Sequence, residues 1–107
     1  MKLNLGKFEE IVLLIVAAQH GEAYGMSITK TIEKELERSV TLSSVHTSLY
    51  RLEEKGLVKS QVGGASEIRG GRSKRLFMIT EKGKESLKKS RQMGEKLWDM
   101  ASSVVYG

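Results

Sequence analysis

Apolar and polar positions follow one another along this chain with a spacing that changes from helical to strand-like and back to helical. Residues 7–20 contain the run IVLLIVAA and are apolar almost all round, which predicts a helix that is buried on more than one side. Over residues 25–37, the apolar side chains Ile28, Ile32 and Leu36 recur every four residues. This spacing predicts a second helix with those three side chains on its inward face.

A third helix is predicted to begin near Thr41 or Ser43, because both side chains are good N-caps, and to end at Gly56. Its apolar residues recur at steps of three, four and three, which makes one buried stripe. The opposite face carries short hydroxyl side chains and one arginine, and such a face can lie close to DNA and bond its bases or phosphates. The stripe consists of Leu42, Val45, Leu49 and Leu52, and the opposite face of Ser43, Ser44, Thr47, Ser48 and Arg51, with Tyr50 at its margin.

Two strand-like segments follow at 57–62 and 75–80, and a segment rich in glycine and arginine joins them. The joining segment is too long for a tight turn, and we interpret it as a wing that becomes ordered on a phosphate backbone; a plain hairpin loop is the alternative. A helix followed by a basic wing suits DNA, because the helix can enter the major groove while the wing reaches phosphates or the minor groove. The basic residues predicted to contact DNA are Arg69, Arg72, Lys74 and Arg75.

A fourth helix is predicted to begin after an N-cap at Thr80 and to occupy the rest of the chain. Its apolar residues recur at steps of seven, or of three and four, and form a seam that three short helices cannot cover. The seam therefore predicts a homodimer that packs through this helix. Trp98 is interpreted as an anchor of that interface or as the wall of an effector pocket between subunits. The predicted interface residues are Leu87, Gly94, Leu97, Trp98, Ala101 and Val105.

Composition and charge exclude several classes of protein. The chain has 107 residues, which suits a single domain, and its net charge of +5 is uneven, because residues 69–91 hold nine basic residues against two glutamates. Cysteine is absent, and neither His20 nor His46 lies in a nucleophile or metal-binding motif, so we expect no catalytic residue, metal or cofactor. The longest apolar run, 11–18, is too short to span a bilayer, so we expect a cytoplasmic protein with no membrane partner.

Four segments of the chain carry a family resemblance. They are LGKFEEIVLLIV at 5–16, EAYGMSI at 22–28, SSVHTSLYRLEEKGLVKS at 43–60 and RGGRSKRLFMITEKGKESL at 69–87. In combination these segments resemble the PadR family of bacterial winged-helix transcriptional regulators, although RLEEKGL alone occurs in many winged helices. Many members of that family have a tyrosine followed by a proline where this chain has His46 and Thr47, so their base contacts do not transfer directly.

The resemblance implies a mainly α-helical fold with a small β-hairpin. A winged helix-turn-helix domain would occupy 1–80, and a C-terminal dimerisation helix would occupy 81–107 as part of the same compact unit. The resemblance further implies a homodimeric repressor that binds a pseudo-palindromic operator in double-stranded DNA and that a small-molecule effector or another signal releases. The helix at 42–55 would read the major groove, and the wing at 63–74 would contact the backbone or the minor groove.

An alternative hypothesis keeps the fold and changes the function. A winged helix can serve as a protein-interaction or ligand-sensing module in which DNA binding is weak or lost. The two hypotheses differ in what the basic wing does, since only the first requires its positive charge.

Overall fold

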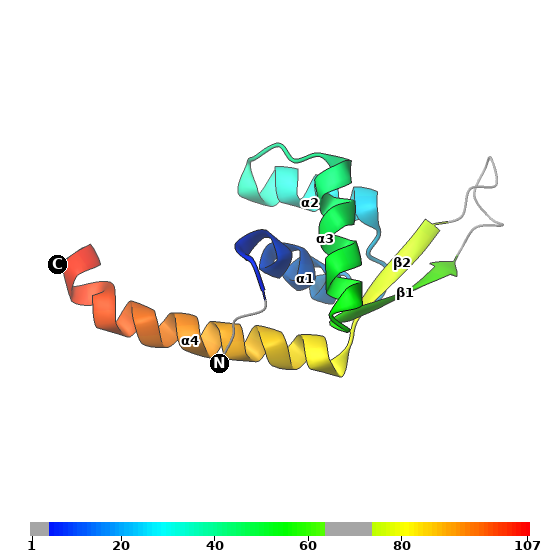
Figure 1. Ribbon diagram of the computed structural model, residues 1–107. Coiled ribbons are helices and arrows are strands. Elements are labelled where there is room, and N and C mark those ends of the chain that lie inside the picture. The colour runs from blue at the N-terminus through cyan, green and yellow to red at the C-terminus, as the bar shows by residue number, and fades with distance from the viewer. Residues whose placement is uncertain (1–4, 64–73) are drawn as a thin grey trace.

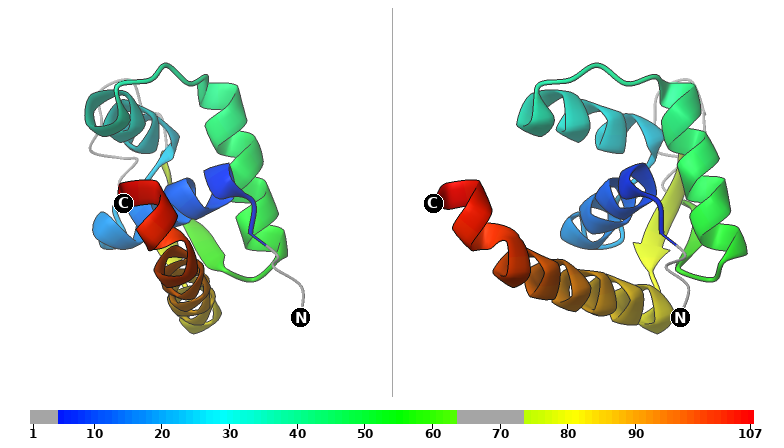
Figure 2. Two further views of the ribbon diagram at one scale, coloured as in Figure 1. Left: turned by 90° about the vertical axis from the view of Figure 1, so that its left-hand side faces the viewer. Right: turned by 60° about the vertical axis from the view of Figure 1, so that its left-hand side comes forward.

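The structure is a computed structural model in which residues 5–63 and 74–107 are described. Four helices and one two-stranded antiparallel hairpin follow each other along the chain (Figure 1), so the fold is mainly helical, as the sequence predicts. The elements are α1 (Lys7–Ala18), α2 (Gly25–Leu36), α3 (Leu42–Glu54), β1 (Val58–Gly63), β2 (Lys74–Ile79) and α4 (Glu81–Tyr106). Helices α1, α2 and α3 and the hairpin pack together, while α4 runs past α1 and projects away from them (Figure 1; Figure 2, right).

The core lies where α1, α2, α3 and the hairpin meet, and the apolar stripes of the sequence supply it. Its buried side chains are Val12, Leu13, Val16, Ala23, Ile28, Ile32, Val45, Leu49, Leu52, Leu57, Val58 and Phe77. The prediction that Leu36 and Leu42 belong to the core is wrong, because Leu36 is 44% exposed and Leu42 is 38% exposed. Leu36 is the last residue of α2 and Leu42 the first of α3, so both lie at helix ends, beyond the layer that covers the middle of each helix.

Left-handed backbone conformations end two of the helices earlier than the sequence predicts. After α1, His20 has φ 52° and Gly21 has φ 83°. After α2, Glu37 has φ 51°, a backbone conformation that residues other than glycine and asparagine seldom adopt. Each predicted helix therefore loses its last residue or two. After α1 the chain turns toward the hairpin, and after α2 it leads into α3.

The two strands of the hairpin pair in a regular register, and β2 makes one isolated bridge to the link between α1 and α2. Val58 pairs with Ile79 and Gly63 with Lys74, so each strand is shifted by one residue from its predicted bounds. The backbone N–H of Phe77 also donates to the carbonyl of Ala23 at 2.8 Å, which makes an isolated antiparallel bridge. The link between α1 and α2 is thereby attached to the edge of β2.

Thr80 connects the end of α3 to the start of α4. Its hydroxyl donates to the carbonyl of Gly56 at 2.7 Å and accepts from the backbone N–H of Gly83 at 3.0 Å, so the predicted N-cap is confirmed. Glu81 follows in the first turn, where a hydrogen bond and the charge of Lys84 hold its pKa below the ordinary value. An ionised Glu81 suits the N-terminal end of a helix.

Candidate nucleic-acid interface

The outer face of α3 carries most of the residues that the sequence predicts to contact DNA. Thr41 caps this helix by accepting from the backbone N–H of Ser44 at 3.0 Å. Ser48 does not fit the prediction, because it is only 6% exposed and shares a groove with Phe8 and Glu9 of α1. The first turn of α1 therefore covers the part of α3 where Ser48 lies. The predicted residues that are exposed on α3 are Ser43, Ser44, Thr47, Tyr50 and Arg51.

Two of these hydroxyl groups already donate to the backbone of their own helix. Ser44 Oγ donates to the carbonyl of Thr41 at 2.8 Å, and Thr47 Oγ1 donates to the carbonyl of Ser43 at 3.0 Å. In this geometry each oxygen still has lone pairs with which to accept a hydrogen bond. Both side chains can accept from the amino group of a base without rearrangement, whereas donation to a phosphate requires the existing bond to break.

Tyr50 is held at the margin of this face by a neighbouring ring. The ring centroids of His46 and Tyr50 are 6.1 Å apart, with the planes inclined by 30°. His46 is half-buried and Tyr50 is exposed. This spacing lies within the range of offset-stacked aromatic pairs.

An ion pair between distant parts of the sequence fixes the C-terminal end of α3. Lys55 Nζ lies 2.6 Å from Glu9 Oε1, and the Glu9 side chain is only 10% exposed. The two residues are 46 positions apart, and no spacing along the chain links them, so sequence reasoning missed the pair. The contact joins α1 to the end of the helix that is predicted to enter the major groove.

The base of the wing, by which we mean Lys74 and Arg75 at the start of β2, carries positive charge next to α3. Arg75 Nη1 donates to Ser60 Oγ at 3.0 Å. Ser60 Oγ in turn donates to Glu53 Oε2 at 2.8 Å, which connects the wing base to the last turns of α3. Lys74 Nζ lies 4.3 Å from the centre of the Tyr24 ring. Two further predicted contacts, Arg69 and Arg72, lie outside the described residues.

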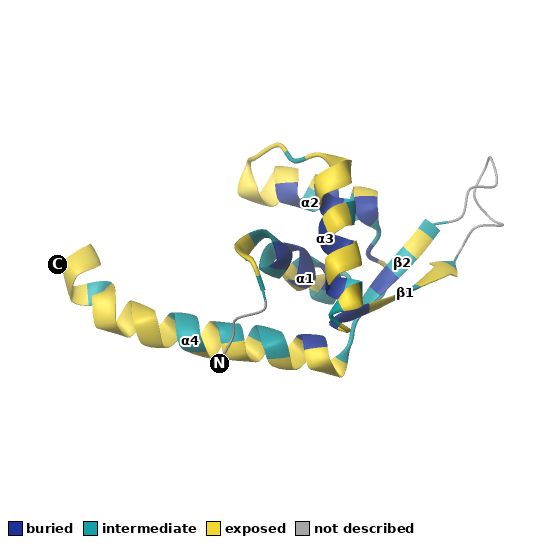
Figure 3. Cartoon of the chain, in the orientation of Figure 1, coloured by how far each residue is buried: buried dark blue, intermediate teal, exposed yellow. Residues whose placement is uncertain are grey.

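Helix α4 exposes its apolar seam over its C-terminal half (Figure 3). Leu97 is 61% exposed, Trp98 53% and Val105 55%, and Ala101 is exposed between them. The ring of Trp98 stacks on that of Tyr106, with centroids 6.0 Å apart. Exposed apolar residues in such a row mark a surface that a partner can cover.

The N-terminal half of α4 differs from the rest of the seam. Leu87 is half-buried and packs against the core of its own chain, although the sequence assigns it to the dimer interface. Gly94 is half-buried and lines a groove of about 640 Å³ between α1 and α4, together with Leu14 and Trp98. The groove places Trp98 next to α1.

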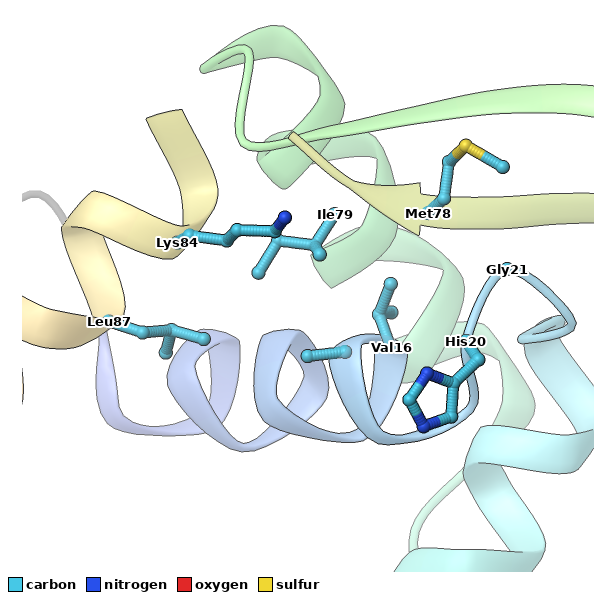
Figure 4. A pocket seen from close by; sticks show the side chains of 8 residues that line it. Val16, His20, Gly21, Met78, Ile79, Lys84 and Leu87 are labelled. Atoms are coloured by element: carbon cyan, nitrogen blue, oxygen red, sulfur yellow. The ribbon is translucent and has the colours of Figure 1, made fainter. Parts of the chain in front are cut away.

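A second cavity, of about 580 Å³, lies where α1, β2 and α4 meet, and no pattern along the sequence indicates it. Figure 4 shows Val16 and His20 on one side and Met78, Ile79 and Lys84 on the other. Its lining combines an apolar surface with two nitrogen-bearing side chains. A molecule that filled it would contact both α4 and the helical body.

Metal binding and membrane insertion find no support in the described parts of the chain. Residues 5–63 and 74–107 hold no group of three or more His, Asp or Glu side chains placed to bind a metal ion. Over the same residues, no helix combines the length and the apolar character needed to cross a membrane.

Comparison with known proteins gives one matching family and several solved structures with the same fold as this chain. The family model for the transcriptional regulator PadR-like family matches residues 12–89. No curated protein sequence matches the chain. At 22% identity, the chain shares its fold with a PadR-like transcriptional regulator from Bacillus cereus, with a TM-score of 0.75 over 94% of this chain and 92% of the other.

Two further solved structures share the fold. A PadR family transcription regulator from Clostridium difficile is 22% identical, with a TM-score of 0.72 over 92% of this chain and 98% of the other. The structure of Bacillus subtilis PadR in complex with operator DNA is 24% identical, with a TM-score of 0.64 over 77% of this chain and 45% of the other.

Proposed function

Because the chain belongs to the PadR-like family of transcriptional regulators, we propose that it binds a specific operator as a homodimer and represses transcription until a signal releases it. It would act in the cytoplasm, where a bacterial operator lies. The observation that carries the proposal is the exposed, hydroxyl-rich face of α3 next to the two cations of the wing base. The family is one of regulators and not a class of enzymes.

The arrangement of the two parts suits a duplex. Small side chains let α3 approach base edges in the major groove, where Arg51 can bond a guanine with two hydrogen bonds. In that orientation we expect Lys74 and Arg75, at the start of β2, to meet phosphates at the side of the groove. The shared fold with Bacillus subtilis PadR, whose structure is a complex with operator DNA, supports DNA as the partner of this chain.

We expect selection from genomic DNA fragments to recover a pseudo-palindromic site with half-sites about one helical turn apart. Binding to that site should weaken about a hundredfold between ~50 mM and ~200 mM salt, if each protomer neutralises about two phosphates and releases their counterions. Fluorescence anisotropy with a labelled operator measures this slope. A preparation with no preferred sequence and no salt dependence would show that the DNA interface is wrongly assigned.

Two arginine variants separate the predicted base contact from the predicted phosphate contact in the same assay. Arg51→Ala should lower discrimination at one base pair of the half-site by about 1–3 kcal/mol. Arg75→Ala should weaken all sequences about equally and reduce the salt slope, because it removes a phosphate contact. Equal loss on every sequence for both variants would contradict the role given to Arg51.

The partner that best fits the exposed seam of α4 is a second copy of the chain. Its residues Leu97, Trp98 and Val105 are more than half exposed in the single chain, and a two-fold contact would cover the same residues on both copies. A dimer through α4 also gives two copies of α3, which a pseudo-palindromic operator requires.

Release by a small molecule remains part of the proposal, with Trp98 as its reporter. Trp98 is the only tryptophan, and it lines the groove between α1 and α4. We expect an apolar or aromatic effector that enters this groove to change the emission of Trp98 and, at the same concentrations, to release labelled operator DNA. A compound that releases DNA and leaves the emission unchanged would place the effector elsewhere, for example in the cavity between α1, β2 and α4.

A further inference from the structure

Three consecutive residues, Ala23, Tyr24 and Gly25, form a corner between α1 and α2 that touches both halves of the proposed DNA interface. Ala23 is fully buried, and its carbonyl accepts the backbone N–H of Phe77 at 2.8 Å. Phe77 lies in β2, three residues after Lys74. The corner therefore holds the strand that carries the wing base.

Gly25 places the same corner directly against α3. A Cβ at this position would lie 2.6 Å from Nε2 of His46 and 3.1 Å from Cδ1 of Leu42. A larger residue there would force the His46 imidazole out of its present position. The first residue of α2 and the first turns of α3 are consequently in direct contact, and the corner has a fixed position relative to the recognition helix.

Tyr24 lies between these two contacts and reaches the wing base with its ring. The backbone N–H of Tyr24 donates to Ser27 Oγ at 3.0 Å, so a hydrogen bond to the Ser27 side chain holds the residue at the start of α2. Its ring lies under the ammonium group of Lys74, with 4.3 Å between Nζ and the ring centre. This distance is within the range of a cation–π contact.

A contact of this kind orients the lysine without consuming its hydrogen-bonding capacity. The ammonium group has three N–H donors, and the face of one ring leaves donors free for a phosphate. A free lysine side chain loses rotamer freedom when it binds, and a lysine held in advance loses less. Tyr24 can therefore strengthen binding to DNA without touching DNA.

We propose that Tyr24 is a positioning residue of the DNA interface, whose ring holds Lys74 at a fixed place relative to α3, so that the wing base and the recognition helix meet the duplex as one unit. This inference rests on the proposed function, since it assigns Lys74 to a phosphate contact. The Ala-Tyr-Gly segment thereby acts in DNA binding although it lies outside both the major-groove helix and the wing.

The contact is measurable in the free protein by nuclear magnetic resonance. The aromatic ring current should shift the ε-protons of Lys74 upfield in the wild type and in Tyr24→Phe, and the shift should disappear in Tyr24→Leu. Tyr24→Phe is the matched control because it keeps the ring and removes only the hydroxyl. Ordinary ε-proton shifts for Lys74 in the wild type would overturn the proposal, whether or not any variant folds.

DNA binding tests the consequence of the contact. Tyr24→Leu should bind the operator about threefold more weakly than the wild type, because a lysine that is not held in advance loses more rotamer freedom on binding, while Tyr24→Phe binds like the wild type. The salt slope of Tyr24→Leu should stay unchanged, because Lys74 keeps its charge, whereas Lys74→Ala should lower the slope. If Tyr24 had only a structural role, the loss of affinity in Tyr24→Leu would be the same whichever side chain stood at position 74.

The double variant Tyr24→Leu/Lys74→Ala completes the test, with melting temperatures to show that each variant is folded. It should bind no more weakly than Lys74→Ala alone, because the ring acts only through the lysine. If the affinity losses of the two single variants added together in the double variant, the proposal would be overturned. The proposed function would still stand, because the wild type binds the operator. A wild type without any operator would instead contradict the proposed function, and the ring-current shift would still show whether the contact exists.

Discussion

Replacement of Leu97 by glutamate should convert the protein from a dimer to a monomer and weaken operator binding by about a hundredfold or more, because linked binding sites lose this much when they are separated. Leu97 is 61% exposed in the single chain and lies beside Trp98 on the seam of α4. A carboxylate at this position would have to lose its water in a dimer interface, which is costly for an unpaired charge. Analytical ultracentrifugation gives the oligomeric state, and anisotropy with labelled operator gives the affinity.

Gln92→Glu is the matched control for that experiment. It adds the same charge to the same helix at an exposed position about half a turn away from the seam, so the dimer and the affinity should stay unchanged. The emission of Trp98 offers a second measurement, since it should shift to longer wavelength when the seam is exposed to water. A Leu97→Glu protein that sediments as a dimer would show that the copies associate through another surface.

Gly83→Ala should lower the free energy of unfolding by about 2 kcal/mol, although alanine usually favours a helix over glycine. Gly83 is buried in the first turn of α4, and a Cβ there would collide with the carbonyl oxygen of Leu57 and lie 2.7 Å from Cγ1 of Ile79. The carbonyl belongs to the backbone and also accepts the N–H of Thr80 at 3.0 Å, so it cannot swing aside as a side chain could. Urea denaturation followed by circular dichroism measures the loss.

Gly94→Ala on the same helix separates this collision from the general effect of adding a methyl group. A Cβ at Gly94 would meet no atom within 4 Å in the single chain. In the Leu97→Glu background, where no second copy covers the helix, this change should raise the free energy of unfolding by about 0.5–1 kcal/mol. If both glycine variants were stabilised alike, α4 would not approach Leu57 as closely as the structure indicates.

The local pattern of the sequence was enough to predict each element and the family. The steps of three and four residues through Val45, Leu49 and Leu52 depend only on neighbours along the chain, and so does the N-cap that Thr80 makes with Gly83. The same is true of the motifs that resemble the PadR family, which the match over residues 12–89 confirms. Periodicity and capping are local properties, and they persist in whatever way the elements pack.

Only the tertiary structure decided which residues of each helix are buried and which polar side chains contact each other. Ser48 belongs to the polar face of α3 by sequence, yet the start of α1 buries it, while Leu42 continues the apolar stripe and is left exposed. The pairs Glu9 with Lys55 and Tyr24 with Lys74 join residues that are far apart along the chain. Such contacts depend on how helices and strands approach one another in space, and no spacing along the sequence records that approach.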